Sequence, residues 1–589
     1  MKRILALLLV AAMAAGGCSL KKEEPLPPVP TVDNAINIQL GGEPDTLDPA
    51  FAATADEESY IMHLFEGLTI LDDKLEPKPG VAESWERTVS DAGVITYTFK
   101  LNPEAKWSDG EAVKAEDFIY AWSRVLDPST KSPLAYRLYP ISGAKAIHQD
   151  KAELTTLGVK ATEDGSLQLV LEGECPDLLQ RLATAPWMPL RESVVSAKPN
   201  GWYYDADKFL TNGPYTLDKW ERDQQITMVR SDSYHGIDSV KAKRLNFVLM
   251  EDEAALMAAF KDGTVQLATT LPLLDIEALD KDTRHTDTIL GSYILAFNTG
   301  KKPFDNADVR KALSLAIDRT AIAAVLRDGS VPATGLVPNG AVVDGTDFRT
   351  KGGKLLPAAP DLEKSKKLLK DAGYENGKGM PTIVFLINDE DTHRRVAESV
   401  AKMWEPLGVL VEVQSAGWDE YLAKREDGKF DVTRGAIFSD NLYPAAFLDS
   451  WTGDNQLNYT GYKSADYDAL IDMSYGRKPK VSEEEAKAEE KKTEEKKAEE
   501  KKTEEKKTEE KKTDSSEATA KDEAAEPTKT AMDYLTEAEK LLVDTDTVIV
   551  PLTWYTNRYA VAPGMDGLRS YPTGTMYFGT ASYKKPAEK

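Results

Sequence analysis

Strand-like and helix-like patterns of apolar residues alternate along most of the chain. In VITYTFKLN, residues 94–102, every second residue from Ile95 to Leu101 is apolar or aromatic, which predicts a half-buried strand. In EDFIYAWSRVL, residues 116–126, apolar residues recur at spacings of three and four, which predicts an amphipathic helix with acidic residues in its first turn. Both element types are therefore expected in one core.

Three later segments continue this mixture. Residues 306–326 predict one long amphipathic helix, and residues 361–374 predict a second helix that ends at Gly373. PTIVFLIND, residues 381–389, follows directly and predicts a buried strand. Helices that alternate with strands in this way are typical of βαβ units, so the patterns predict an α/β or a mixed fold class.

Residues 480–527 depart from this pattern. They contain a five-residue repeat of Glu and Lys with almost no apolar side chains. A period of five advances about 140° per repeat around a helix, so no apolar stripe forms that could pack on a core. We expect a solvated insertion in a surface loop, either a single charged helix or a disordered segment, with a spacer or a cell-wall contact as the alternative role.

The N-terminus has the pattern of an export signal. Lys2 and Arg3 precede an apolar run over 4–12, which is too short to span a bilayer but suits a signal peptide. Small residues at 15–17 precede Cys18 and resemble a bacterial lipobox, with Ala15 where leucine is usual. We expect a signal peptide over 1–17 and a lipidated Cys18 that begins a Pro-rich tether over 18–34, and the alternative is an ordinary signal peptide.

Composition narrows the function further. The 589 residues are 41% hydrophobic, enough for several domains or lobes, and the formal net charge of -25 argues against nucleic acid as a partner. With Cys18 lipidated, the second cysteine, Cys175, has no partner for an intramolecular disulfide and is expected to be a buried small hydrophobe. The KWSDG string at 106–110 predicts a turn next to a core tryptophan, Trp107.

Several long strings, in one order along the chain, resemble a known family. They are GGEPDTLDP (41–49), LFEGLTILDDKLEPKPGVAESW (64–85), YTFKLNPEAKWSDGEAVKAEDFIYAWSR (97–124), NGPYTLDKW (212–220), AKRLNFVLMEDEAALMAAFKDGTVQLA (242–268), LAFNTGKKPFDNADVRKALSLAIDR (295–319) and VIVPLTWYTNRYAVAP (548–563). They resemble the family 5 solute-binding proteins of ABC importers, and among these the oligopeptide-binding proteins.

This resemblance implies a fold and its boundaries. The fold would be α/β and like the type II periplasmic binding proteins, with two lobes joined by a hinge and an additional domain on the first lobe. The expected boundaries are lobe I over 35–56, 180–290 and 556–589, the additional domain over 57–179, and lobe II over 291–555 with the insertion inside it.

The stretch FDVTRGAIFSDNLYP, residues 430–444, carries the candidate binding site. If it is extended, Arg434 and Asp440 share one face and lie about 20 Å apart. In the proteins it resembles, the matching strand pairs with the backbone of a bound peptide, and an aspartate captures the peptide's α-ammonium. The resemblance therefore implies Asp440 as the amine anchor, with backbone pairing at Ala436, Ile437 and Phe438 and, from an opposing segment, at Glu43, Pro44, Asp45 and Thr46.

The resemblance leaves the other contacts open. Arg434, His393 and Arg327 are candidates for the peptide carboxylate, and Tyr120, Trp418 and Trp554 for the walls of side-chain pockets. Ile437 stands where the family usually has tryptophan, so the pocket shape differs. The alternatives are core packing for the aromatic residues, a surface turn for Asp440, and ordinary salt bridges or exposed positions for Arg434 and His393.

A free peptide is a zwitterion with an extended backbone, which suits a strand bracketed by opposite charges. We therefore expect an extracytoplasmic, lipid-anchored, monomeric receptor that captures oligopeptides and delivers them to the transmembrane subunits of an ABC permease, without cofactor or metal. The alternatives are a receptor of the same fold for a nickel chelate, haem or an oligosaccharide, or a derived sensor or adhesin. An enzyme is not expected, because the five histidines are scattered and neither an H-E-x-x-H nor a G-x-S-x-G string occurs.

Overall fold

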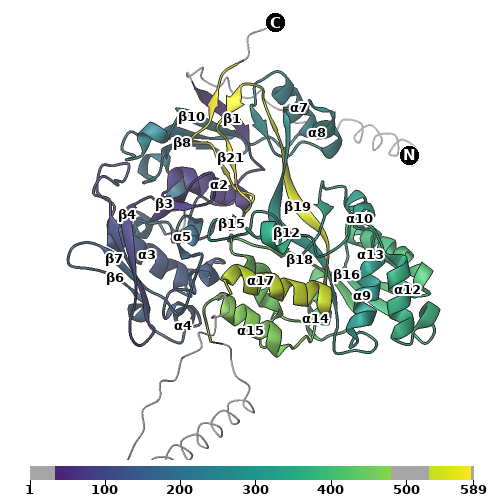
Figure 1. Cartoon of the computed structure of the whole chain (residues 1–589). Coiled ribbons are helices and arrows are strands. Elements are labelled where there is room, and N and C mark those ends of the chain that lie inside the picture. Colours follow the sequence, from purple (N-terminus) through teal and green to yellow (C-terminus); the bar gives the residue numbers. More distant parts are fainter. Residues whose placement is uncertain (1–33, 200, 456, 479–528, 586–589) are drawn as a thin grey trace, which may run out of the picture.

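The structure is a computed structural model that describes residues 34–199, 201–455, 457–478 and 529–585 (Figure 1). The predicted signal peptide, Cys18, nearly all of the tether and the whole insertion over 480–527 lie outside the described residues. Within the described residues, no helix combines the length and the apolar character needed to cross a membrane.

One large mixed sheet connects the two halves of the molecule. The first half comprises the described residues before 284 and after 561, and the second half those between 297 and 549. Its two long antiparallel strands, β12 (Arg284–Phe297) and β19 (Ile549–Val561), run side by side through the centre (Figure 1). They link an upper part with β1, β8 and β10 to a lower right part with β16 and β18. The strand order, with bounds, is β17 (Val411–Ala416), β16 (Ile383–Asn388), β18 (Val432–Phe438), β12, β19, β11 (Leu267–Ala268), β1 (Ala35–Gln39), β10 (Arg244–Val248), β9 (Gln225–Arg230) and β8 (Tyr215–Glu221), and β13 (Val331–Pro332) pairs with β19.

The first half adds a separate antiparallel sheet to its part of the large one. This sheet has the order β4 (Ala82–Val89), β5 (Ile95–Leu101), β7 (Leu167–Val170) and β6 (Val159–Ala161). The predicted strand over 94–102 is confirmed by β5 and the predicted helix over 116–126 by α3 (Ala115–Leu126). The other helices of this half are α2 (Ala55–Leu64), α4 (Ala144–His148), α5 (Leu178–Arg181), α6 (Glu192–Ala197), α7 (Glu253–Lys261) and α8 (Leu273–Ala278).

Two predictions about single side chains in this half are confirmed. Trp107 is 1% exposed, and its indole N–H donates a hydrogen bond to Asp117 at 3.0 Å. Cys175 is a free, buried cysteine. The turn predicted at KWSDG is also present, because Gly110 has a φ of 90° and its N–H donates to the Trp107 carbonyl.

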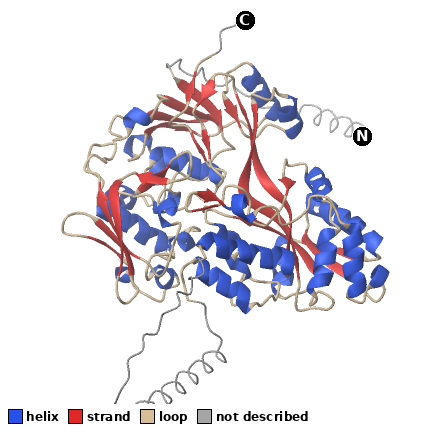
Figure 2. Ribbon diagram, in the orientation of Figure 1, coloured by secondary structure: helices blue, strands red, loops and turns tan. Residues whose placement is uncertain are grey.

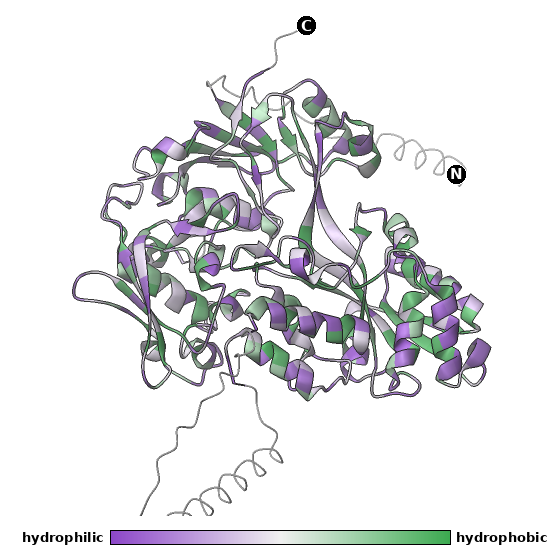
Figure 3. Ribbon diagram, viewed as in Figure 1, coloured by the Kyte–Doolittle hydropathy of each residue, from purple (hydrophilic) through white to green (hydrophobic). Residues whose placement is uncertain are grey.

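In the second half, α13 (Asp391–Trp404) and α14 (Trp418–Glu426) pack against β16 and β17. Figure 2 shows helices next to the strands at the lower right, and Figure 3 shows that they carry both apolar and polar residues. The apolar face of α13, for example, buries Val396, Val400 and Trp404. Its helices are α9 (Ala307–Leu315), α10 (Arg319–Leu326), α11 (Phe348–Gly352), α12 (Leu362–Asp371), α13 (Asp391–Trp404), α14 (Trp418–Glu426), α15 (Ala465–Ser474) and α17 (Ala531–Lys540).

The prediction of one long helix over 306–326 is wrong. The chain forms α9 and α10 with a break between them, because the side chain of Asp318 accepts a hydrogen bond from the N–H of Ala321 and caps a new helix. The two other predictions in this region are confirmed. Helix α12 stops at Asp371 just before Gly373, which has a φ of 92°, and β16 forms the predicted strand.

The helices α15 and α17 lie on either side of the insertion in the sequence and pack against each other (Figure 1). Tyr467 of α15 is fully buried, as are Leu535 and Ala538 of α17, and all three belong to one apolar cluster. The core of this half is thus completed by residues from both sides of the insertion.

Candidate functional site

Strand β18 has one edge that is paired for only part of its length. On one side it pairs with β12 from Val432 to Phe438. On the other side β16 pairs only with Val432 and Thr433. The carbonyl of Arg434 on this side accepts a hydrogen bond from the Tyr421 hydroxyl at 2.5 Å. The stretch from Gly435 to Phe438 therefore presents a free edge on the β16 side, which is the arrangement that a peptide added as a strand requires.

The register decides which backbone groups point to this free edge. The N–H of Ser439 donates to the carbonyl of Leu290 at 2.9 Å. In an antiparallel pair, alternate residues exchange hydrogen bonds, so Ile437 points its backbone groups toward β12. Ala436 and Phe438, which are both exposed, point theirs toward the free edge. Of the three residues expected to pair with a peptide, these two have the required orientation and Ile437 does not.

Asp440 follows β18 and is bound to residues from the other half of the molecule. Its Oδ2 lies 2.5 Å from Nε of Arg137 and accepts a hydrogen bond from the Tyr136 hydroxyl at 2.7 Å. Its Oδ1 accepts a hydrogen bond from the Asn441 amide at 3.2 Å. Burial acts to raise the pKa of Asp440, but Arg137 and these hydrogen bonds lower it more, so the net pKa is below its ordinary value. Asp440 is therefore an ionised, largely enclosed carboxylate rather than a surface turn.

Arg434 lies further along the same strand and is a buried cation. Its Nη1 donates a hydrogen bond to Oδ1 of Asn388 at 3.0 Å, and its guanidinium lies 5.4 Å from the ring centre of Tyr293. Within the described residues it forms no salt bridge, and its buried Nε has no hydrogen-bond partner. A buried guanidinium without a carboxylate is costly, so the site favours an anion here.

His393 and Arg327 are the two other candidates for the peptide carboxylate. His393 differs from Arg434 in charge, and Arg327 differs from it in position. His393 lies beside Arg434, with Nδ1 3.2 Å from the Tyr293 hydroxyl and Nε2 2.9 Å from Glu390. Burial first, and the charge of Arg434 second, lower the pKa of His393 to about 4, and the contact with Glu390 does not offset this. At neutral pH it can therefore offer a hydrogen bond but no charge. Arg327 is exposed, at the end of α10, with a φ of 57°.

The opposing segment 43–46 is irregular and is held by its first residue. Glu43 accepts hydrogen bonds from the Trp220 indole at 2.6 Å, from Arg222 at 2.7 Å and from the backbone N–H of Asp223 at 2.9 Å. Pro44 and Thr46 are buried and Asp45 is exposed. The side chain of Glu43 thus anchors this segment within the first half.

The three aromatic candidates are in different environments. Trp418 is 57% exposed at the start of α14, where it stacks on Tyr421. Trp554 is 5% exposed, and its indole N–H donates to the carbonyl of Gly335 at 3.0 Å. Tyr120 is half-buried on α3 and packs against the core of the first half. Only Trp418 presents a large free ring surface.

A cavity of about 190 Å³ lies beside Asp440. Asp440, Asn441 and Leu442 line one side of it. Residues of α2, of 65–71, of 180–188 and of the C-terminal segment between 569 and 580 line it as well. The lining is mostly apolar, yet Glu58 and Arg181 also reach it. Of the predicted site residues that the structure describes, Asp440 is the one that lines this cavity.

Sequence reasoning missed the residues that surround Asp440. Tyr136 and Arg137 belong to the turn η1 (Ala135–Leu138), and Glu58 lies on α2. Both segments are distant from Asp440 in sequence, and neither carries a pattern that points to a binding site. Their proximity arises only from the tertiary fold.

Comparison with known proteins shows the family of the chain. The model of the bacterial extracellular solute-binding proteins, family 5 (middle region), matches residues 76–459. The chain belongs to this family. Family 5 consists of solute-binding proteins, so the predictions of this family and of a binding protein rather than an enzyme are confirmed.

Individual relatives cover most of the chain. The periplasmic oligopeptide-binding protein OppA of Escherichia coli K12 is 32% identical over 470 residues, which is 78% of this chain and 85% of that protein. The dipeptide-binding protein DppE of Bacillus subtilis 168 is 31% identical over 443 residues, which is 74% of this chain and 80% of that protein.

Solved structures of the family share the fold. The unliganded open form of MppA, a periplasmic murein tripeptide-binding protein, has a TM-score of 0.73 at 27% identity, with 94% of this chain and 97% of that chain covered. The predicted α/β fold with two lobes, a hinge and an additional domain is therefore confirmed, while the exact domain boundaries stay predictions.

Proposed function

We propose that this family 5 protein captures oligopeptides outside the cytoplasm and delivers them to the transmembrane subunits of an ABC importer. The relatives named above are oligopeptide-, dipeptide- and murein-tripeptide-binding proteins, which supports a peptide ligand. Cys18 would carry a lipid anchor and the tether over 18–34 would hold the receptor at the membrane, as one monomer.

The free edge of β18, with a buried cation at one end and a buried carboxylate beyond the other, carries this proposal. A peptide laid along the edge would exchange backbone hydrogen bonds with Ala436 and Phe438. Its amine would approach Asp440, and its carboxylate would supply the anion that Arg434 lacks within the described residues. Since backbone and terminal charges are common to all peptides, such a site would accept varied sequences.

The segment 43–46 and the residues Trp418 and His393 remain part of the proposal with narrower roles. The segment 43–46 would pair with the second edge of the peptide, and Trp418 would provide a wall for side chains. His393 would donate or accept a hydrogen bond next to Arg434 without a charge. An oligosaccharide, a haem or a nickel chelate would not need opposite charges at the two ends of a free strand edge.

The first experiment identifies the ligand class directly. Native mass spectrometry of the protein purified without refolding should show co-purified peptides as discrete added masses. Masses of a sugar, a haem or a nickel chelate in their place would contradict the proposal.

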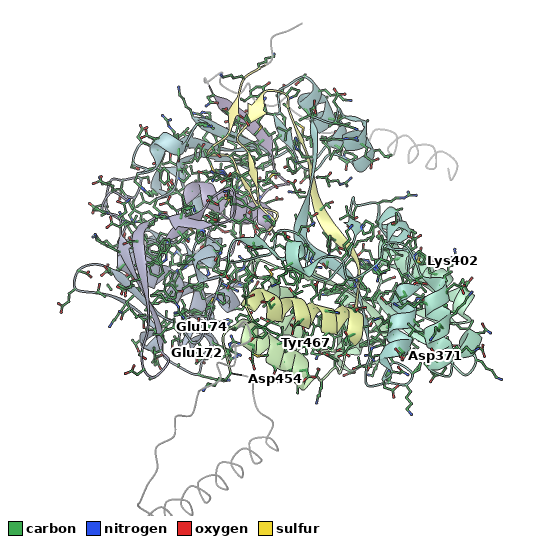
Figure 4. All side chains as sticks on the ribbon, viewed as in Figure 1. Glu172, Glu174, Asp371, Lys402, Asp454 and Tyr467 are labelled. Atoms are coloured by element: carbon green, nitrogen blue, oxygen red, sulfur yellow. The ribbon has the colours of Figure 1, made fainter. Side chains whose placement is uncertain are left out.

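The second experiment tests the amine anchor. Asp440→Asn should weaken the binding of peptides with a free amine by tenfold or more, because it removes the opposing charge, and should hardly change the binding of N-acetylated peptides. Asp371→Asn, which loses an exposed i,i+4 ion pair with Lys367 on α12, is a matched control and should bind like the wild type (Figure 4). Equal losses for both kinds of peptide in Asp440→Asn would count against the anchor.

The lipid anchor is tested separately. A Cys18→Ala variant expressed in a bacterial host should appear in the soluble extracytoplasmic fraction, whereas the wild type should sediment with membranes and carry the added mass of its acyl chains. An unchanged distribution would rule out the anchor without affecting the peptide site.

A further inference from the structure

The carboxylate of Asp440 shares its arginine with a second carboxylate. Arg137 contacts Asp440 through Nε and Glu58 through Nη1. The side chains of Arg137, Glu58 and Asp440 are only 8%, 10% and 20% exposed. One guanidinium thus faces two carboxylates in an enclosed environment, and the three side chains carry one uncompensated negative charge when both carboxylates are ionised.

The other nearby arginine does not remove this charge. Arg181 contributes to the electrostatic environment of Asp440, but its Nε lies 2.8 Å from Oδ2 of Asp177. Asp177 is 4% exposed, so the charge of Arg181 is already matched at close range by a carboxylate other than Asp440. The uncompensated charge therefore belongs to the group formed by Glu58, Arg137 and Asp440.

Both carboxylates also face the same space. Glu58 on α2 and Asp440 after β18 line the cavity of about 190 Å³ described above. A cation at the Asp440 end of this cavity would interact with the charges of both residues. Burial raises the pKa of Glu58, and the guanidinium of Arg137 offsets only part of this effect, so a nearby cation would favour the ionised form of Glu58.

The hydrogen bonds of Asp440 leave room for such a cation. Its Oδ2 already interacts with Arg137 and with the Tyr136 hydroxyl. Its Oδ1 accepts only the amide N–H of Asn441 among the hydrogen bonds of the described residues. Because each carboxylate oxygen can accept two hydrogen bonds, Oδ1 can accept a further bond from an ammonium group.

We propose that Glu58 is a specificity-determining residue of the amine site: it neutralises Arg137, so that the negative charge of Asp440 remains available to the amine of the ligand. Without Glu58, the positive charge of Arg137 would cancel the negative charge of Asp440. The site would then have no net charge to attract a cation. The ligand class is a peptide, or another extended molecule, that ends in a free primary amine. This inference rests on the proposed function.

The proposal predicts an order among three variants. With every carboxylate of the group ionised, its charge is −1 in the wild type, 0 in Glu58→Gln, −2 in Arg137→Gln and −1 again in the double variant. The preference for a free over an acetylated amine should therefore fall about tenfold or more in Glu58→Gln, rise or stay in Arg137→Gln, and return to near the wild-type value in the double variant. A purely structural role of Glu58 would not be rescued by removing Arg137.

The experiment is calorimetric titration at pH 7.5 of the full-length protein with tri-, tetra- and pentaalanine and with their N-acetylated forms. The measured quantity, for each length, is the dissociation constant of the N-acetylated peptide divided by that of the free peptide. A high ratio means a preference for the free amine. Glu174→Gln is the matched control, because Glu174 pairs with Arg87 at 2.6 Å on the surface of the same half of the molecule (Figure 4). It should leave the ratio unchanged.

The outcomes separate this inference from the function on which it rests. An unchanged ratio in Glu58→Gln, or equal weakening of both peptide forms, overturns the role of Glu58 while the Asp440→Asn result still stands for the anchor. Failure of the wild type to prefer any free peptide overturns both. If Glu58→Gln does not fold, Arg137→Gln decides the question, because a ratio lower than that of the wild type contradicts the charge balance.

Discussion

The imidazole Nε2 of His63 accepts a hydrogen bond from the backbone N–H of Phe578 at 2.8 Å. His63 lies on α2, and its Nδ1 is 2.5 Å from the carbonyl of Ser59, to which it donates. The ring is fully buried, so a neutral histidine with its proton on Nδ1 joins the N-terminal and C-terminal parts of the first half.

This contact predicts a loss of stability in mild acid. Burial lowers the pKa of His63 to about 4, whereas the unfolded chain has a pKa near its ordinary value of 6.5. As the pH falls from 6.5 to 4, the unfolded state binds the proton first, so the free energy of unfolding should fall, by about 3 kcal/mol from this residue. Urea unfolding at several pH values measures this. His63→Phe should be less stable at pH 7 yet show a shallower decline, and an unchanged slope would contradict the assignment.

Asp449 predicts the opposite dependence of stability on pH, because its contribution becomes unfavourable as the pH rises. Burial raises the pKa of Asp449 to about 6, and its Oδ1 is buried without a hydrogen-bond partner among the described residues. A raised folded-state pKa means that the ionised form is disfavoured, so this residue lowers stability above pH 6 and ceases to do so below pH 4. Asp449→Asn keeps an acceptor for the Tyr475 hydroxyl and should be more stable than the wild type at pH 8, by up to about 3 kcal/mol, and gain nothing at pH 4. Chemical denaturation at both pH values checks this, and equal gains would contradict it.

Arg434 predicts a change in which binding and stability move in opposite directions. Arg434→Met keeps a long side chain but removes the buried charge, so peptides with a free carboxylate should bind tenfold or more weakly and C-terminally amidated peptides should bind about as before. The free energy of unfolding should stay equal or increase, because no carboxylate is left unpaired within the described residues. Calorimetry and thermal unfolding of the same samples test both parts. A large loss of stability would show that Arg434 is structural.

The free edge of β18 predicts a contrast between adjacent residues. Ala436→Pro removes an N–H that faces the free edge, whereas Ile437→Pro removes one that bonds to β12. The first variant should lose peptide affinity with a smaller loss of stability, and the second should be destabilised by about 3 kcal/mol or more. Denaturation and titration of the two proteins give the comparison. Similar destabilisation by both would mean that the register does not leave this edge free.

The buried pair of Arg349 and Glu539 should contribute far more to stability than exposed pairs. Glu539 is fully buried, and its Oε1 also accepts the N–H groups of Leu336 and Val337 at 2.8 and 2.9 Å. Glu539→Ala leaves Arg349 without its carboxylate and removes the acceptor of both N–H groups, so a loss of about 3–5 kcal/mol in the free energy of unfolding is expected. Asp371→Asn, the exposed control used above, should cost about 1 kcal/mol or less. A loss of similar size in both would be inconsistent with this account.

Elements whose burial is periodic could be predicted from the sequence, and elements that depend on one polar residue could not. The pattern of residues 94–102 identified β5, and that of 116–126 identified α3, because one face of each packs on the core. The apolar residues of 306–326 hide a break, since Asp318 occupies one polar position that also fits a continuous helix but acts as a cap.

The candidate site was predictable only along its own strand. Resemblance indicated Asp440 and Arg434, but whether Ala436 or Ile437 faces a ligand depends on the register with β12. Arg137 and Glu58 come from segments that meet Asp440 only in three dimensions. The positions of these charged residues next to Asp440 therefore follow from the structure and not from the sequence.

The packing of α15 against α17 has a consequence for how this receptor can change over time. Since Tyr467 and Leu535 close the same cluster from both sides of the insertion, the two chain ends at its base are held by the core itself. Genetic additions or deletions over residues 480–527 would change the length and charge of that segment without removing any residue of this cluster. Selection can therefore vary the segment independently of the packing on either side of it.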